Sequence, residues 1–364
     1  MFYDLPNVLA ILIVVLACFR LGLIPLWITL ILGAYAFAPF LLNDVLFPAT
    51  YMPDQFLYFR IVHSIREFDL SYTPFSTTVD TASWFFAFIP LPFVETIQSL
   101  GFYNRFLVTI LIVWLYSVKH VRGLPLLLLL MYPSLLLYSS LALRDTLIFF
   151  FMMLSVIFFI ENKRALALLI TTPLFFIKFQ NFFLMIVFFV VYLTFTRGSI
   201  FYKLRYFLLP LVLASLAPFI MSIIEVLNFY RRAMFIEDGG DDYLYQSVTT
   251  LGDFLVMGLQ SAPYFLIKPL PWETENLFQF IQSLENFILV FFLFFIFYKS
   301  FRIDRLISIK WFFVLLISLT IYGLVVFNYG TAVRYKFPFV LITVVGLGYD
   351  LYLRHGVFLC WSKK

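Results

Sequence analysis

Charged residues are scarce in this chain. Of its 364 residues only 12% are Asp, Glu, Lys or Arg, whereas 63% are hydrophobic and 50 are phenylalanine. Soluble domains carry about 25% charged residues, so the composition excludes an ordinary soluble protein and predicts an integral membrane protein. Runs with little or no charge recur along the whole length, at 21–43, 123–143, 206–224, 276–298, 311–333 and 337–349. Such runs suit helices that cross about 30 Å of hydrocarbon at about 1.5 Å per residue.

Cysteine, histidine and cofactor motifs are also scarce. The two cysteines, Cys18 and Cys360, fall on one predicted face of the membrane, so no disulfide framework is expected. The chain has three histidines and no Walker loop, dinucleotide glycine motif, HExxH motif or cysteine-rich metal signature. This pattern argues against a nucleotide-driven enzyme or a zinc enzyme. We therefore expect no metal site, no cofactor and no nucleic-acid partner.

The apolar runs lack the period-two alternation of barrel strands, which predicts helices. Internal repeats and Gly/Ser linkers are absent as well. We expect one all-α, polytopic membrane domain over residues 1–364, with about eleven transmembrane helices and a first span at 5–19 in place of a cleaved signal peptide. The segment 84–97 contains two prolines, so a re-entrant or interfacial segment is expected there.

Basic residues mark one face of this domain. Fifteen of the 25 Lys and Arg lie in six turns, at Arg20, Lys119 and Arg122, Lys163 and Arg164, Arg197, Lys203 and Arg205, Lys299, Arg302, Arg305 and Lys310, and Arg354, Lys363 and Lys364. The positive-inside rule assigns these turns to the cytoplasm. The N-terminus and the loops at about 43–83 and 227–275 are then expected on the opposite, outer face of the membrane.

Charges within apolar runs are the first candidates for a site. Arg144 and Asp145 precede the apolar run 146–160, which spans only about 22 Å as a helix, and Lys178 lies 14 residues after Arg164. Charges at such depth line a cavity or pair with each other. We therefore expect Arg144, Asp145 and Lys178 at the floor of an outward-facing pocket. The alternatives are a helix cap with an ion pair for Arg144 and Asp145, and a lysine that snorkels to the surface.

Further cations are expected on the same outer face. Arg231 and Arg232 are candidates to bind phosphate, or else to pair with the acidic residues at 237–242. Arg334 and Lys336 are expected in a turn at 328–336 between two spans. Arg144 and Arg334 would then grip one diphosphate from opposite sides.

The first outer loop contains candidate bases. Asp54 could accept the proton of an attacking sugar hydroxyl, or could simply cap a turn. His63 could do the same, although it is three residues from both Arg60 and Arg66 on one helical face and could equally be an interfacial histidine. Arg60 is a candidate to bind substrate.

A cationic pocket among aromatic residues suits a polyprenyl diphosphate that carries sugars, because arginine matches phosphate oxygens and rings stack on sugar faces. Three stretches, "YMPDQFLYFRIVHSIRE" (51–67), "YPSLLLYSSLALRDTLIFFFMMLSVIFF" (132–159) and "NYGTAVRYKFPFV" (328–340), resemble Wzy-type polysaccharide polymerases and the related EpsG-like proteins, which are GT-C-like membrane glycosyltransferases. The resemblance implies polymerisation of undecaprenyl-diphosphate-linked oligosaccharide repeat units at the periplasmic face, in O-antigen or related lipopolysaccharide synthesis. Implied partners are this lipid-linked oligosaccharide, membrane lipid, a chain-length regulator and other polysaccharide-assembly proteins.

Other functions fit part of the same pattern. A metal-dependent glycosyltransferase could use Asp54, Glu67 and Asp69 as its acids, and a glycan ligase would use the same lipid-linked donor. A flippase would need polar groups reachable from both faces. Because nearly all buried polarity is expected at the outer face, the polymerase is the favoured interpretation.

Overall fold

The computed structural model of the protein describes residues 2–43, 45–48, 50, 52–69, 74–207, 220–237 and 240–360. Every regular element in these ranges is a helix, and the β-bridge between Asn43 and Phe47 is isolated. This confirms the all-α prediction. The predicted span 206–224 and the basic residues Lys363 and Lys364 lie largely or wholly outside the described residues.

The chain forms two compact units, one of residues 1–185 with 360–364 and the other of residues 186–359. The boundary falls within one helix, α11 (Phe179–Phe195). Each unit is described by itself below. The single domain over residues 1–364 stays a prediction.

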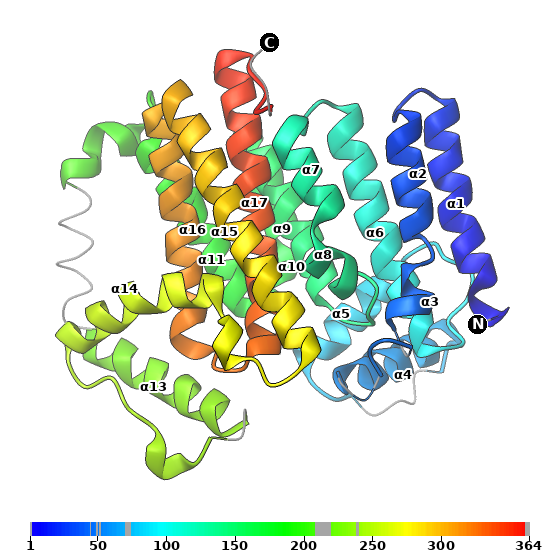
Figure 1. The fold of residues 1–364 in the computed structure, drawn as a ribbon, viewed down its shortest axis with the longest axis horizontal. Helices are drawn as coiled ribbons and strands as arrows, with labels where there is room; N and C mark the ends of the chain where they lie inside the picture. The colour runs from blue at the N-terminus through cyan, green and yellow to red at the C-terminus, as the bar shows by residue number, and fades with distance from the viewer. Residues whose placement is uncertain are drawn as a thin grey trace. The chain divides into compact units, whose positions relative to one another are not determined.

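The first unit is a group of helices around α6. Its helices are, in chain order, α1 (Leu5–Arg20), α2 (Leu26–Tyr35), α3 (Ala38–Leu42), α4 (Asp54–Arg66), α5 (Thr77–Ala87), α6 (Ile97–Ser117), α7 (Gly123–Met131), α8 (Pro133–Tyr138), α9 (Asp145–Ile160), α10 (Arg164–Ile177) and the start of α11 (Figure 1). Helix α6 packs against α1, α3, α4 and α9.

The N-terminus is fastened to the start of α6. The buried carboxylate of Asp4 accepts hydrogen bonds from the hydroxyls of Thr96 and Ser99, each at 2.6 Å. Ser99 in turn accepts from the backbone N–H of Thr96, which completes a capping box at the first turn of α6. Helices α1 and α6 therefore begin at the same end of the unit.

Two of the expected spans in this unit are broken. The run 21–43 forms α2 and α3, and the run 123–143 forms α7 and α8 followed by an irregular stretch. At the second break Tyr132 is extended (ψ 109°) because it precedes Pro133, and proline disfavours helical geometry in the residue before it. The expected loop 43–83 likewise contains α4 and most of α5, so it is a partly helical segment.

The second unit surrounds α16. It contains the end of α11, then α13 (Ile220–Glu237), the short η4 (Asp242–Leu244), α14 (Leu251–Ile267), η5 (Pro271–Glu273), α15 (Leu277–Ile303), α16 (Arg305–Val325) and α17 (Tyr329–His355) (Figure 1). Helix α16 packs against α13, α14, α15 and α17. The expected loop 227–275 thus includes the end of α13 and all of α14.

The predicted turn at 328–336 is wrong. Helix α16 ends at Val325, and α17 already begins at Tyr329, where the Asn328 side chain accepts a hydrogen bond from the backbone N–H of Thr331 at 3.2 Å. Asparagine is a strong N-cap, and Arg334 and Lys336 then extend the helix because charge alone does not end one. Both residues therefore lie in the first turns of α17.

Among the described residues, four helices are long and apolar enough to cross a membrane, namely α6, α15, α16 and α17. A fifth span results if α11 is joined to the helix Ile200–Phe207, to which it is bent by 92°. Five other apolar segments of 10 to 17 residues are shorter. These helices are compatible with a membrane protein, and the count of eleven spans stays a prediction.

Candidate functional site

The irregular segment 139–144, between α8 and α9, is held from two helices. The side-chain amide of Asn104 in α6 donates to the carbonyls of Leu141 and Leu143 at 2.7 and 2.8 Å. From α4, the side-chain oxygen of Gln55 accepts from the backbone N–H of Ala142 at 2.8 Å. Because these polar groups are buried, their hydrogen bonds hold the segment in one conformation.

Arg105 of α6 lies directly beside this segment. Its side chain is 2% exposed, donates to the hydroxyl of Ser139 at 2.7 Å and lies 5.4 Å from the ring centre of Tyr35. Within the described part of the chain its Nε–H has no hydrogen-bond partner and no carboxylate pairs with it. A buried guanidinium without an anion is costly, so this place favours negative charge.

Arg144 and Asp145 end the segment and begin α9. The Arg144 guanidinium donates to the carbonyl of Ile177 at 3.1 Å, so it lies at the break between α10 and α11, next to the buried Lys178. Its Nε–H is buried without a partner in the described residues. Thus the structure brings Arg144, at the start of α9, to the 177–178 peptide, and the outward-facing pocket expected at these residues stays a prediction.

This cluster lies well inside the unit. Asn104 is eight residues beyond the cap at Thr96, which corresponds to about 12 Å along α6. Helix α9 begins at the end of the segment 139–144, and the N-terminal end of a helix favours anions. Positive groups therefore outnumber the single buried carboxylate of Asp145.

Asp54 and His63 both lie in α4. Asp54 begins the helix and is exposed, one residue before the Gln55 that holds Ala142. His63 is partly exposed, and its Nδ1 lies 3.2 Å from the carboxylate of Glu67. Arg60 is exposed on the same helix. Asp54 thus adjoins the residue that bonds to the segment 139–144, whereas His63 lies more than two helical turns further along α4.

Arg231 and Arg232 have separate surroundings in the second unit. Arg232 is exposed and forms a bidentate ion pair with Asp242, which holds the pKa of that carboxyl below its usual value. This is the local ion pair that the sequence left open as an alternative. Arg231 is buried, donates to the carbonyl of Leu324 and lies 5.4 Å from the ring centre of Phe327.

Two buried lysines of the second unit bind the carbonyl ends of helices. Lys268 donates to Val326, just after α16, at 2.7 Å. Lys336 of α17 donates to Leu266 at 3.0 Å and to Lys268 at 3.1 Å, at the end of α14, and the Glu285 carboxylate attracts it. Cations at helix C-termini are stabilising, so Lys336 has a structural role whether or not it binds substrate. Arg334 is half-buried, 5.9 Å from the ring centre of Tyr335.

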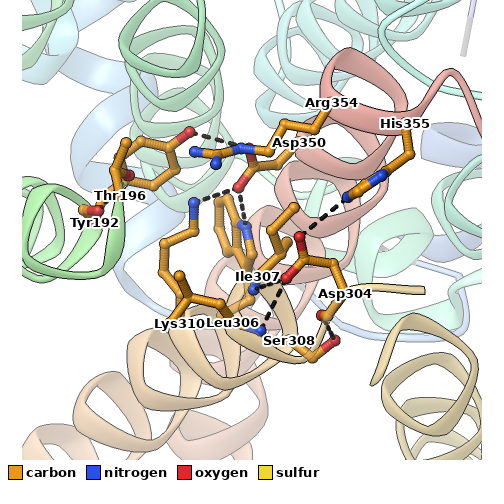
Figure 2. A network of polar contacts seen from close by, with 11 residues as sticks. Tyr192, Thr196, Asp304, Leu306, Ile307, Ser308, Lys310, Asp350, Arg354 and His355 are labelled. Carbon is orange, nitrogen blue, oxygen red and sulfur yellow. Dashed lines mark hydrogen bonds and ion pairs between the residues drawn. The ribbon is translucent and has the colours of Figure 1, made fainter. Parts of the chain in front are cut away.

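A second polar network lies near the other end of α17. Asp350 is fully buried and accepts from Tyr192 at 3.2 Å, Trp311 at 3.2 Å and Arg354 at 3.1 Å, and also from the buried Lys310 (Figure 2). It therefore joins α11, α16 and α17. The distance from Lys336 to Asp350 is fourteen residues, or about 21 Å along α17.

Next to this network Asp304 caps α16. Its carboxylate accepts from the backbone N–H groups of Leu306 and Ile307 at 2.9 and 3.0 Å and lies 3.0 Å from Nε2 of His355 (Figure 2). Burial raises the pKa of Asp304, but the hydrogen bonds from Ile307 and His355 outweigh this effect and hold it below the usual value.

Buried polarity is therefore not confined to one end of each unit, and the expectation that it would be is wrong. In the first unit, the buried His120, which follows α6, lies 2.6 Å from the Glu161 carboxylate that follows α9. In the second, Lys310 and Asp350 are fully buried. All four belong to turns that the basic residues assigned to the cytoplasm. Hydropathy did not predict their burial, because it does not indicate which charges find partners.

Sequence reasoning missed several residues of these clusters. Gln55 and Asn104 carry no charge and are not among the expected site residues, although a polar amide in an apolar helix indicates a buried hydrogen bond. Arg105 is not among the expected site residues, although it is a charge within the long apolar helix α6. Lys268 lies outside any predicted span.

Arg144 belongs to the first unit and Arg334 to the second, so their predicted joint grip on a diphosphate stays a prediction. Within the described ranges, no three His, Cys, Asp or Glu side chains are grouped as metal ligands would be. No family model, no curated protein and no solved structure matches this chain.

Proposed function

We propose that this chain is a glycosyltransferase of a bacterial inner membrane that polymerises oligosaccharide repeat units linked to undecaprenyl diphosphate, with its site open to the periplasm. The growing glycan moves from its lipid carrier to the terminal sugar of a new lipid-linked unit. The chain's apolar helices and the resemblance to Wzy-type polymerases motivate the proposal.

One observation carries the proposal, namely the cationic cluster at the segment 139–144. Arg144 and Arg105 both have a buried Nε–H without a partner in the described residues, and neither pairs with a carboxylate there. Lys178 and the N-terminus of α9 add positive potential. An anion supplied by a substrate would complete this cluster, and a diphosphate offers the oxygens that match a guanidinium.

The transfer requires one base and one group that stabilises the leaving diphosphate. A hydroxyl oxygen of the acceptor sugar attacks the anomeric carbon, and the bond from that carbon to the diphosphate oxygen breaks. The hydroxyl proton passes to the Asp54 carboxylate. Arg144 stabilises the negative charge that gathers on the leaving diphosphate, more strongly in the transition state than in the ground state. The buried Arg105 positions the segment through its hydrogen bond to Ser139.

The glycan profile of cells that lack the gene tests the proposal. A single repeat unit capped on the lipid carrier is the expected result. Long chains that stay on the lipid would instead mean a ligase, and precursor retained in the cytoplasm would mean a flippase. Loss of transfer by the purified protein on chelation would favour a metal-dependent transferase.

The flippase has one specific observation in its favour. The buried Lys310 and Asp350 lie about 21 Å along α17 from Lys336, so the second unit has buried charge at two levels. A transporter needs polar groups at both levels. A vesicle assay for movement of lipid-linked oligosaccharide, performed with Lys310→Met, distinguishes this candidate from the polymerase.

A further inference from the structure

A hollow in the second unit lies outside the cationic cluster and serves none of the roles described above. It is bounded by the strap 245–248 and by the first two turns of α14. Its lining consists of Tyr245, Gln246, Ser247, Asp253, Val256 and Met257.

The strap is a firm wall because Asn228 of α13 holds it. The Asn228 amide donates to the carbonyl of Val248 at 2.7 Å, and its side-chain oxygen accepts from the Val248 N–H at 2.9 Å. The Tyr245 hydroxyl donates to Asn228 at 3.1 Å, and its ring centre lies 6.0 Å from that of Phe235. One amide thus fixes both the strap and the orientation of an aromatic ring in the hollow.

The opposite wall is fixed by the cap of α14. The Thr250 hydroxyl accepts from the N–H of Asp253, and the Oδ2 of Asp253 accepts from Thr250 N–H at 3.0 Å and from the Thr249 hydroxyl at 2.9 Å. The bonds from Thr250 and Thr249 hold the pKa of Asp253 below its usual value, so this carboxyl is ionised at neutral pH. Its Oδ1 accepts no hydrogen bond within the described part of the chain.

Several polar groups in the hollow are therefore available to a ligand. Gln246 and Ser247 are exposed, and their side chains form no hydrogen bond with other described residues. Beside them Val256 and Met257 present an apolar surface on α14. This combination of an amide, a hydroxyl, a carboxylate oxygen, an aromatic ring and a small apolar patch matches a sugar, which has hydroxyls at its rim and C–H groups on its faces.

Other ligand classes fit less well. None of the lining residues is a cation, and the Asp253 carboxylate would repel a phosphate. A lipid chain would leave Gln246, Ser247 and Asp253 without hydrogen bonds, which is unfavourable. Asp253 is the only acidic residue among the described residues that line the hollow, so the hollow lacks the several oxygen ligands of a metal site.

We propose that this hollow binds uncharged sugar residues of the glycan, at a distance along the chain from the cationic cluster that takes the diphosphate. The proposal rests on the proposed function for the identity of the glycan. The hollow acts as a binding subsite for the hydroxyl-rich part of the substrate, and the side chains of Gln246, Ser247 and Asp253 provide its hydrogen bonds.

Binding of a lipid-free oligosaccharide tests the proposal. The probe is the single repeat unit released by mild acid from the lipid-linked precursor of the same cells, titrated against the full chain in lipid nanodiscs by saturation-transfer NMR. We expect the double variant Gln246→Ala/Ser247→Ala to bind about tenfold more weakly, because two hydrogen bonds are lost. Asp253→Asn should weaken binding while it keeps an oxygen to cap α14. Gln260→Ala, exposed on the same helix outside the hollow, is the matched control.

The outcomes separate this proposal from the proposed function. If the wild type does not bind the oligosaccharide, or if the variants bind it as the wild type does, the subsite is wrong. Normal elongation of lipid-linked donor alongside that result would leave the transferase intact. Conversely, binding that depends on Ser247 and Asp253 in a protein that never elongates the donor supports the subsite and refutes the transferase. Arg144→Ala should stop transfer without weakening oligosaccharide binding.

Discussion

The backbone of α6 at Gly101 lies against the carbonyl group of Ser140. A Cβ atom at Gly101 would lie 2.3 Å from that carbonyl oxygen and 3.0 Å from its carbon, closer than such atoms can approach. Glycine is therefore required where α6 meets the segment 139–144. Asn104, one turn further along α6, makes its hydrogen bonds to the same segment.

Gly101→Ala should destabilise the protein by about 1–3 kcal/mol. The added methyl group would displace the backbone at Ser140, which belongs to a segment that buried hydrogen bonds hold in place. The midpoint of thermal unfolding in mild detergent measures this loss. Gly33→Ala is the control, since its Cβ would meet only a Leu12 side-chain atom at an ordinary 3.8 Å. Equal stability of the two variants would contradict the close approach.

Arg144→Ala should lower the transfer rate by about 10²–10³-fold, because a fixed donor to the leaving diphosphate is lost. Arg144→Lys keeps the charge but not the planar fork, so it should be impaired nearly as much. Transfer by purified protein from a lipid-linked donor measures both rates. Arg164→Ala, an exposed cation at the start of α10, should leave the rate unchanged. Full activity of Arg144→Lys would mean that only the positive charge at this position matters and that the guanidinium geometry does not.

A double-mutant cycle tests the predicted pairing of Arg144 with Arg334. If the two guanidinium groups bind one diphosphate, the effects of Arg144→Ala and Arg334→Ala on the transfer rate should be non-additive by at least about 0.5 kcal/mol. Strict additivity, in variants that remain folded, would mean that they act on different groups.

Asp54→Asn should retain binding of the lipid-linked donor but lose about 10²–10⁴-fold in transfer rate, because an amide cannot accept the hydroxyl proton. Asparagine occupies the same space at the start of α4, so folding should be preserved. Single-turnover kinetics separate binding from transfer. Near-normal polymer from this variant would move the role to His63, which His63→Gln then examines.

Asp350→Asn should destabilise the second unit by about 3–5 kcal/mol, because it leaves the fully buried Lys310 without its carboxylate. Lys310→Met should cost less, since Asp350 keeps its bonds from Arg354, Tyr192 and Trp311. Thermal unfolding in detergent gives the order of the two. Arg302→Ala removes an exposed cation and serves as the control. A larger loss for Lys310→Met would refute the central role of Asp350.

The predicted orientation places residue 243 in the periplasm and residue 197 in the cytoplasm. In a chain with both native cysteines replaced by serine, Tyr243→Cys should react with a membrane-impermeant maleimide in intact spheroplasts. Arg197→Cys should react only after lysis. Both side chains are exposed, so access within the protein does not limit labelling. The reverse pattern would invert the topology.

The helices could be predicted from hydropathy, but their ends and their polar contacts could not. The run 311–333 was read across the true break at 326–328, because Val326 and Phe327 are as apolar as the helices on either side. Arg334 and Lys336 were assigned to a turn because they are charged, whereas the Asn328 cap starts α17 before them. A charged residue in the sequence indicates a side chain that is costly to bury. The sequence does not indicate which backbone carbonyl will accept a hydrogen bond from it in the fold and so reduce that cost.

The candidate site was predicted in part. Arg144 with Asp145 and Lys178 stood out because short apolar runs leave charges below the ends of longer helices. Asn104 and Gln55 did not, because a neutral amide changes hydropathy little even when it fixes a backbone segment. Asp350 is not among the expected site residues, since four donors from three helices cannot be inferred from its neighbours in sequence.

Helix α17 is held near both ends, through Lys336 on the carbonyls that end α14 and through Asp350 on α11 and α16. Most of its length between these points is buried, so neighbouring side chains resist bending. A stiff helix that is bonded to its neighbours near both ends transmits rotation from one end to the other. Any rotation imposed on α17 at Lys336 must either break the three bonds that Asp350 accepts from Tyr192, Lys310 and Trp311 or carry α11 and α16 with it.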